Sequence, residues 1–276
     1  MSEYTVKIWG CSGSIPSPRD SFHLEKRIYE ILSMAVEQNI TQREQVSSFI
    51  KDLPFHLKGT YHGNTPCIQI MNDSDDIIIF DAGTGIRELG KSILPILSPE
   101  KKIHIFISHL HWDHIQGFPF FDPIYINYCD INIYGCHNNL ENNFREQQRF
   151  EHFPVTFDKL PAKINFFQIQ PDQDVIIGDF SIKPHLVPHP GGSYSYRVEK
   201  NKQIFVYATD LEIKNFQENS LLKFYQFFQD AEYLIYDSMY TVPENIVKED
   251  WGHSSAIIGV DLALKSNVKN LVLFHH

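Results

Sequence analysis

The sequence is poor in cysteine and in positive charge, and it has no long apolar run. Its four cysteines form no Cys-x-x-Cys pair, so neither a disulfide framework nor a thiolate metal site is indicated. The first ten residues lack the basic and apolar segments of an export signal, and no run reaches the roughly 18 apolar residues of a membrane span. These absences predict a reduced, cytoplasmic protein with no membrane partner.

The charge balance disfavours binding to polyanions. The chain has 24 basic and 34 acidic residues, a net charge of −10, so any phosphate chemistry needs local positive charge. Fourteen histidines are many for 276 residues, and histidine is the commonest metal ligand in proteins. With 42% hydrophobic residues the chain has enough apolar material for a sizeable core.

A change of pattern near the N-terminus indicates an insertion into one domain. No linker rich in Pro, Gly or Ser divides the chain, so a single domain, 1–276, is expected. After a first alternating strand, apolar residues at helical spacing predict a helical hairpin at about 22–53, whose second helix starts with Thr41 and Glu44 as a capping box. The hairpin is interpreted as packing on the domain, as a dimer contact, or as a lid over the site.

The remainder alternates short apolar segments with loops and helices. Strands are predicted at 4–9, 67–71, 76–80, 103–108, 131–134, 164–168, 181–186, 193–198, 203–208, 233–236 and 270–274, and helices at 85–94, 140–149, 221–229 and 254–264. Many strands without strict alternation of strand and helix predict an α/β (α+β) fold of stacked sheets covered by helices.

The strongest chemical signal directly follows the apolar strand before residue 108. His109, His111, Asp113 and His114 lie within six residues. Because a rigid strand end followed by a tight turn lets several side chains converge, this spacing predicts a metal site. His109 and His111 share one side of an extended segment and can chelate one ion, while Asp113 and His114 can point at a neighbouring ion.

This pattern resembles the HxHxDH motif of the metallo-β-lactamase superfamily, whose fold is an αββα sandwich. The resemblance extends over nearly the whole chain. The segment 77–85 is similar to the family's strand and DAGTG turn, which implies that Asp81 orients a ligand histidine, a turn-capping role being the alternative. His189, in a His-Pro-Gly context, is similar to the family's third histidine, and His185 four residues earlier is expected to be structural. Asp210 resembles the carboxylate that bridges two metals, and His275 the histidine that ends the last strand.

The resemblance therefore implies two divalent metal ions, zinc in the first place and manganese as the alternative. The implied ligands are His109, His111, His189 and Asp210 for one ion, and Asp113, His114, Asp210 and His275 for the other.

Further motifs resemble the branch of ribonuclease Z and the cyclic phosphodiesterases. His253, in the segment 251–255, resembles the histidine that contacts the scissile phosphate and protonates the leaving oxygen, and Asp237 the acidic residue that orients it. In the alternative interpretation His253 is a surface residue beside a helix cap. Asp113 is expected to orient a metal-bridging hydroxide or to accept its proton.

Loops at Gly10–Pro16 and Tyr61–Cys67 resemble those of small cyclic-phosphodiester hydrolases, which include cyclic-nucleotide phosphodiesterases and phage anti-Pycsar enzymes. Between His114 and His189 there is no long basic arm of the kind that ribonuclease Z uses to hold tRNA. Phe118, just past the metal motif, is interpreted as a substrate-binding wall that stacks on a base, or as a core residue.

Together these residues predict a dinuclear phosphodiesterase that hydrolyses a small cyclic phosphodiester, a 3′,5′-cyclic nucleotide in the first place, by attack of a metal-bridging hydroxide. The alternatives are a ribonuclease Z-like tRNA 3′-processing endonuclease and a non-catalytic cyclic-nucleotide-binding protein. The expected partners are the small substrate and, through the hairpin, a second copy in a homodimer, with no extended nucleic acid. The base, the ring linkage and the native metal stay open.

Overall fold

A computed structural model describes residues 4–18, 21–59, 63–71, 76–213 and 218–276. Tyr61 and His62 of the predicted N-terminal motif lie outside these residues. Among the described helices, none combines the length and the apolar character needed to cross a bilayer.

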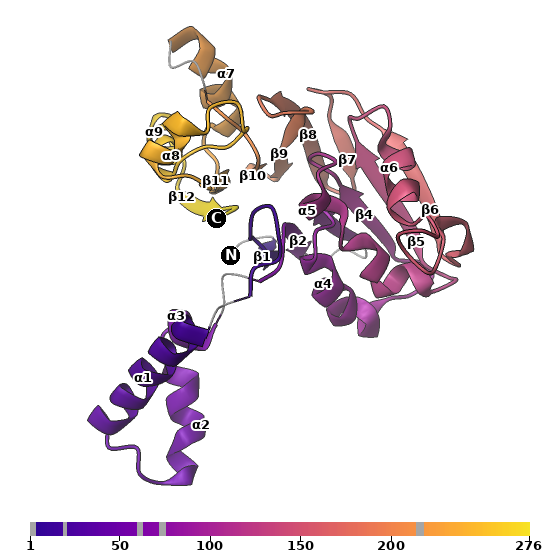
Figure 1. The fold of residues 1–276 in the computed structure, drawn as a ribbon. Helices are drawn as coiled ribbons and strands as arrows, with labels where there is room; N and C mark the ends of the chain where they lie inside the picture. Colours follow the sequence, from indigo (N-terminus) through magenta and orange to yellow (C-terminus); the bar gives the residue numbers. More distant parts are fainter. Residues whose placement is uncertain (1–3, 19–20, 60–62, 72–75, 214–217) are drawn as a thin grey trace.

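Two six-stranded mixed sheets stack on each other with helices on their outer faces (Figure 1), so the predicted αββα sandwich is confirmed. The first sheet contains, in spatial order, β1 (Thr5–Gly10), β2 (Cys67–Met71), β3 (Ile77–Phe80), β4 (Lys102–Phe106), β5 (Asp130–Gly135) and β6 (Lys163–Gln168). The second contains β12 (Asn270–Phe274), β11 (Tyr233–Asp237), β10 (Gln203–Ala208), β9 (Ser193–Lys200), β8 (Phe180–Val187) and β7 (Val175–Ile177). Of these strands only the three-residue β7 was absent from the sequence prediction.

Helices close both outer faces. The first sheet is covered by α4 (Gly85–Ile93), α5 (Trp112–Ile115) and α6 (Leu140–Gln147), with short 3-10 turns at Leu94–Ile96, Phe118–Phe120, Asp122–Tyr125 and Phe157–Lys159. The second sheet carries α7 (Glu218–Phe228) and α9 (Ala256–Lys265), and α8 (Val242–Val247) lies between β11 and α9 in the chain. Helix α5 has four residues and α8 has six, so both are too short to show a helical period in the sequence.

The strands are apolar on both faces because each face meets a different core. In β3, Ile77 and Ile79 pack under the covering helices, whereas Ile78 and Phe80 enter the layer between the sheets. Strands buried on both faces read as continuous apolar runs rather than as alternating ones. This explains why the β3 and β10 segments are so clear in the sequence.

The topology brings many strand ends to one edge of the sandwich. Strands β3, β4, β5 and β6 run parallel, as do β10, β11 and β12. Strand β1 is antiparallel to β2, which is antiparallel to β3, so β1 and β3 run in the same direction. In the same way, β8 and β10 run in the same direction because each is antiparallel to β9. The loops that follow these strands therefore start at a common edge, although they are far apart in the chain.

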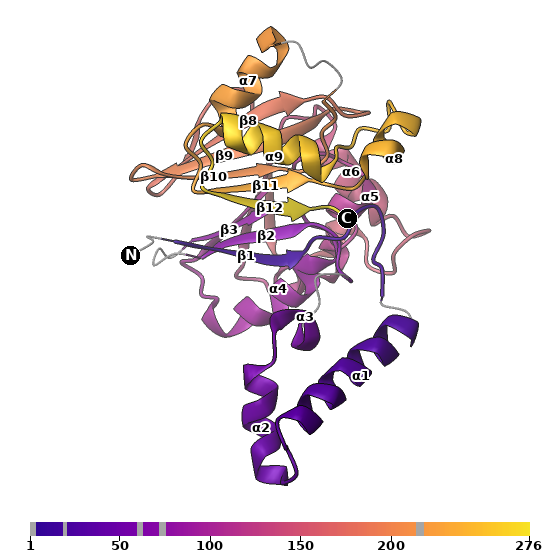
Figure 2. The same cartoon turned by 90° about the vertical axis from the view of Figure 1, so that its left-hand side faces the viewer.

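The predicted helical insertion is confirmed and stands away from the sandwich (Figures 1 and 2). It consists of α1 (Ser21–Glu37), α2 (Arg43–Asp52) and α3 (Phe55–Lys58), between β1 and β2. Its small core contains Phe49, Leu53 and Leu57, against which Ile31, Met34, Ala35 and Ile40 pack.

The predicted capping box of the second helix is wrong by one residue. Helix α2 begins at Arg43, and the side-chain oxygen of Gln45 accepts the backbone N–H groups of Thr41 and Gln42, both at 3.0 Å. Gln45 thus takes the place expected for Glu44 and accepts the N–H groups of the N-cap residue Gln42 and of Thr41 before it. Gln can do so because, like Glu, it has a side-chain oxygen.

Candidate metal centre

The seven predicted metal ligands meet at the edge where the strand ends gather. Each of them follows a strand or lies on the short helix α5, and their ligand atoms fall into overlapping groups within 4.8 Å. The seven residues are His109, His111, Asp113, His114, His189, Asp210 and His275. The sequence separations are large, because His275 lies 162 residues beyond Asp113 and still contacts it.

Asp210 lies at the centre and faces two groups of histidines. Its Oδ1 is 3.6 Å from Nε2 of His109 and 3.9 Å from Nε2 of His189. Its Oδ2 is 3.1 Å from Nε2 of His114 and 3.4 Å from Nε2 of His275. One carboxylate therefore presents one oxygen to each group, which is the arrangement of a bridging ligand.

The first group consists of imidazoles. Nδ1 of His111 and Nε2 of His189 lie 3.2 Å apart, and two nitrogens bound to one tetrahedral zinc at its usual bond length would be separated by about 3.3 Å. His189 donates its Nδ1–H to the carbonyl oxygen of Gly252 at 2.8 Å, which leaves Nε2 free to coordinate. Burial lowers the pKa of His109, His111 and His189, so these rings stay neutral as metal ligands must.

The second group contains more negative charge. Oδ2 of Asp113 lies 3.1 Å from Nε2 of His275 and 3.4 Å from Nε2 of His114, and it accepts the backbone N–H of Ser14 at 2.9 Å. Burial opposes the charged form of His114, but the carboxylates of Asp210 and Asp113 outweigh it and hold its pKa well above the usual range. Such a surplus of buried carboxylate favours occupation by a cation.

Asp81 orients the second group, as predicted. It is fully buried, and its Oδ2 accepts Nδ1–H of His114 at 2.7 Å, the hydroxyl of Tyr207 at 2.7 Å and that of Ser108 at 2.8 Å. Its Oδ1 accepts the backbone N–H of Ser108 at 2.7 Å. This network directs Nε2 of His114 toward Asp210, as outer-shell carboxylates do for ligand histidines.

The residues present fit a pair of divalent cations. The buried Nε2 atom of His109 has no hydrogen-bond partner among the described residues, although an oxygen of Asp210 lies 3.6 Å away. An unpaired buried ring nitrogen is unfavourable unless a ligand occupies its lone pair. The set contains only nitrogen and carboxylate oxygen atoms, which suit zinc and manganese alike.

His253 and Asp237 form a pair next to the two groups. His253 donates Nδ1–H to Oδ2 of Asp237 at 2.7 Å, and Oδ1 of Asp237 accepts backbone N–H groups of Met239 at 3.1 Å and Ser254 at 3.3 Å. The imidazole stacks on that of His275 with ring centroids 5.1 Å apart. Burial opposes the charged form of His253, yet Asp237 outweighs it and raises its pKa. The ring is thus oriented, and the raised pKa favours its protonated form.

Three residues of the centre have a strained backbone. Asp81, Asp210 and His275 adopt left-handed conformations with φ of 59°, 50° and 62°, each within two residues of a strand end. Residues other than glycine rarely adopt such angles, and they are found preferentially at functional sites. Gly13 lies against His275, where a Cβ atom would be 2.8 Å from Nδ1, so the predicted N-terminal loop packs on the centre.

The side chains of Phe118 and His185 lie outside the candidate metal centre. The prediction of Phe118 as a substrate-binding wall is wrong, because the side chain is fully buried and packs on Phe144 at 4.9 Å between ring centroids. The 3-10 turn that carries it points into the core under α4. His185 is outside the cluster, as predicted, and pairs with Asp172 at 2.7 Å.

Three further residues near the centre were not predicted from the sequence. Trp112 lies between two candidate ligands and is 81% exposed, and Trp251, two residues before His253, is 63% exposed. Glu212 follows Asp210 by two residues and is only 4% exposed. A charged residue two positions after Asp210 was the available signal for Glu212, and an indole between two candidate ligands was the signal for Trp112.

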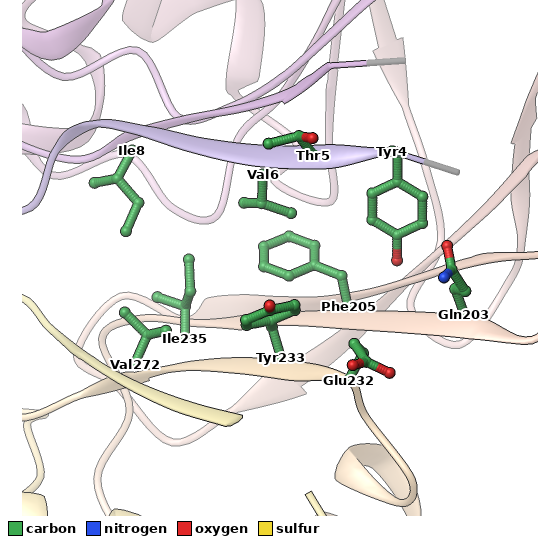
Figure 3. Close-up of a pocket in the computed structure, with 10 residues that line it drawn as sticks. All are labelled: Tyr4, Thr5, Val6, Ile8, Gln203, Phe205, Glu232, Tyr233, Ile235 and Val272. Carbon is green, nitrogen blue, oxygen red and sulfur yellow. The ribbon is translucent and has the colours of Figure 1, made fainter. Parts of the chain in front are cut away.

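A separate cavity of about 290 Å³ lies between β1 of the first sheet and strands β10, β11 and β12 of the second (Figure 3). Its walls are mostly apolar, with Phe205, Ile235 and Val272 on one side and Val6 on the other. None of the seven candidate ligands lines it. This cavity is therefore distinct from the metal centre.

Comparison with known proteins agrees with this architecture. The family described as "Beta-lactamase superfamily domain" matches residues 77–276, from β3 to the end of the chain. Among curated proteins, ribonuclease Z of Oceanobacillus iheyensis is 21% identical over 262 residues, covering 75% of this chain and 81% of that protein.

Solved structures share the fold over almost the whole chain. The short form of human tRNase Z superposes with a TM-score of 0.64 at 17% identity, covering 98% of this chain and 92% of that one. A diphosphatase from the PhnP family gives a TM-score of 0.63 at 16% identity, covering 99% and 86%. The insertion of α1–α3 falls before the region that the family pattern matches.

Proposed function

Because the chain belongs to the beta-lactamase superfamily, we propose that it is a metal-dependent phosphodiesterase acting on a small cyclic phosphodiester, a 3′,5′-cyclic nucleotide. The proposal rests on the position of Asp210, because its two carboxylate oxygens each face a separate group of histidines. The ribonuclease, tRNase and diphosphatase names of the relatives support hydrolysis of phosphoryl bonds.

The side chains have distinct tasks in this reaction. Two divalent ions, held by the two groups that Asp210 faces, would supply positive charge for the phosphoryl oxygens and would lower the pKa of a bound water. Asp113, held by the N–H of Ser14, orients the attacking water or accepts its proton. His253 donates a proton to the departing ribose oxygen, and Asp237 keeps its ring in the orientation and tautomer that this donation needs.

Charge favours a small substrate over RNA. The chain has a net charge of −10, and the protruding segment 21–58 has five basic and five acidic side chains, so it lacks the positive excess of an RNA-binding arm. Residues 115–188 are all described, and their helices and strands belong to the sandwich (Figures 1 and 2). The ribonuclease Z relative nevertheless makes a tRNA endonuclease the second candidate.

Exposed aromatic side chains offer a surface for the base. Trp112 directly follows His111, and Trp251 directly precedes Gly252. Both His111 and Gly252 contact His189. Trp is highly buried on average in folded proteins, and exposed aromatic rings can stack on bases of any sequence. Lys248, 6.0 Å from the Trp251 ring centroid, places a positive charge on the same side.

The test compares leaving groups. Wild type and His253→Ala would be assayed on cyclic mononucleotides, cyclic dinucleotides, a tRNA precursor and bis(4-nitrophenyl) phosphate, with metal content measured on each sample. Nitrophenolate leaves without a proton, whereas a ribose oxygen needs one. We therefore expect His253→Ala to retain its metal and to lose about 10²–10⁴-fold in turnover of the cyclic nucleotide, with a much smaller loss on the nitrophenyl ester.

The matched control is His185→Ala, which removes a histidine with the same 2.7 Å carboxylate contact but outside the centre. It should leave both rates unchanged. Turnover of the tRNA precursor alone would identify the endonuclease, and binding of a cyclic nucleotide without cleavage in single-turnover assays would identify a binding protein. An equal loss on both leaving groups would contradict the role of His253.

We also propose that the chain forms a homodimer through the hairpin. On α1 the side chains of Leu24, Ile28, Leu32 and Val36 repeat every four residues and are 46–77% exposed. An apolar stripe of this kind on a protruding helix is typical of a contact surface. Since the segment 21–58 is neutral while the whole chain carries −10, two copies repel each other least where their hairpins meet.

A further inference from the structure

Glu212 connects two segments that carry different parts of the centre. It lies two residues after Asp210, is 4% exposed, and its carboxylate accepts the backbone N–H of Asp250 on Oε1 and that of Gly252 on Oε2, both at 3.1 Å. Its own backbone N–H donates to the carbonyl oxygen of Pro188 at 2.8 Å. One residue therefore holds the segment that precedes His253 against the segment that precedes His189.

Gly252 transmits this contact to His189. Its carbonyl oxygen accepts Nδ1–H of His189 at 2.8 Å, and its φ of 88° is accessible mainly to glycine. A Cβ atom at Gly252 would overlap the His189 ring. The carbonyl group of Gly252 thus sets the tautomer and the direction of the His189 ring. Glu212 binds the N–H of Gly252 and so holds the preceding peptide unit, which joins the carbonyl at the Gly252 Cα.

The same loop carries the proposed proton donor. His253 directly follows Gly252, and its carbonyl oxygen accepts the side-chain N–H of Asn245 at 3.0 Å. The hydroxyl of Ser254 donates to the carbonyl oxygen of Leu211 at 2.8 Å, so the loop docks on the segment of Glu212 at two points. Displacement of this loop would move the ligand histidine and the proton donor together.

We propose that Glu212 is a positioning residue that sets the geometry of His189 and His253 at the same time. A carboxylate suits this task because both of its oxygens accept, whereas an amide offers one acceptor and would place an N–H donor against the second backbone N–H. Charge-assisted bonds from two N–H groups also fix the direction of the peptide planes more strongly than neutral ones. The part that concerns His253 rests on the proposed function, and the part that concerns His189 does not.

The experiment uses Glu212→Gln, which nearly preserves shape, and Glu212→Ala. Zinc affinity would be measured by competition with a chromophoric chelator, and kcat and KM would be measured on a cyclic nucleotide and on bis(4-nitrophenyl) phosphate. We expect zinc affinity to fall about 10–100-fold in Glu212→Ala and less in Glu212→Gln. We also expect kcat on the cyclic nucleotide to fall by a larger factor than KM changes. This fall in kcat should also exceed the fall in kcat on the nitrophenyl ester.

The matched control is His104→Gln, a buried polar residue in β4 whose ring contacts the hydroxyl of Tyr134 at 3.0 Å, far from the loop. It should lower thermal stability without changing zinc affinity. Gly252→Ala should reproduce the zinc loss of Glu212→Ala, because it displaces the same ring.

Zinc affinity separates the two proposals. If no phosphodiester is cleaved by wild type, the proposed function fails while a zinc loss in Glu212→Ala still supports the positioning of His189. Unchanged zinc affinity in both Glu212 variants, or equal losses in His104→Gln, would overturn the role of Glu212.

Discussion

The metal centre and the helical hairpin depart from the usual distribution of side chains in opposite ways. At the centre, polar groups such as His114 and Asp210 are buried to 0–1% exposure. On the hairpin, apolar groups such as Leu32 and Val36 are 60–77% exposed. Buried polar groups and exposed apolar groups are both unfavourable without a partner, so each kind indicates that its region binds something.

The difference indicates what kind of partner each region requires. The centre offers lone pairs and negative charge in fixed positions, which suit small cations. The hairpin offers a neutral apolar stripe, which suits another protein surface. Changes at the centre are therefore expected to alter metal binding and turnover without altering assembly, and changes on the hairpin to do the reverse.

The largest effect is expected from Asp210→Ala. This change removes the carboxylate that faces both groups of histidines, so both ions should be lost and turnover should fall by far more than the roughly 100-fold typical of residues that only orient ligands. Metal analysis and phosphodiesterase assays would check it. Asp261→Ala, on the exposed face of α9, is the control and should change neither. Retention of two ions per chain would contradict the bridging position.

Single histidine changes should divide the centre into halves. His111→Ala affects the imidazole group and His275→Ala the carboxylate-rich group, so each variant should bind about one ion tightly per chain, and the double variant none. Metal stoichiometry after dialysis against a weak chelator would measure this. Loss of both ions from each single variant would show that the two groups act as one site.

A smaller effect is expected from Asp81→Asn. The amide cannot accept all the hydrogen bonds that the carboxylate receives from His114, Ser108 and Tyr207, so the His114 ring should lose its orientation. Affinity for the ion of that group should fall about 10–100-fold. Tyr207→Phe removes one donor only and should cost less. Metal titration distinguishes this from a general loss of stability, which thermal unfolding would report.

The smallest effect on chemistry is expected from the hairpin. Ile28→Glu combined with Leu32→Glu places charges on the exposed stripe and should convert a dimer to a monomer in sedimentation experiments, with turnover per chain and metal content unchanged. Ser33→Glu on the same helix is the control and should keep the dimer. A wild-type monomer at micromolar concentration would refute the proposed contact.

The sequence predicted the centre better than its surroundings for a physical reason. The ligands sit directly after apolar strands that are buried on both faces, and such strands are the clearest pattern that a sequence offers. The direction of a side chain in an irregular turn has no such pattern. The sequence therefore left Phe118 open between a substrate-binding wall and the core, where it lies, and the exposed Trp112 was overlooked.

Contacts made through backbone groups were also invisible in the sequence. Glu212 acts on peptide N–H groups of residues 250 and 252, and any residue type could supply those donors. Likewise, Ser14 reaches Asp113 through its N–H and not through its side chain. Such contacts follow from the path of the chain and need coordinates to be found.

The division of the ligands between the two sheets has a further consequence. His109 to His114 follow a strand of one sheet, while His189, Asp210 and His275 follow strands of the other. Cations held there would tie the two layers together across a sequence separation of 162 residues, so the free energy of their binding would add to that of closing the sandwich. The loaded protein should consequently melt at a higher temperature than the stripped one, and during synthesis the pocket cannot assemble before His275 has joined the chain.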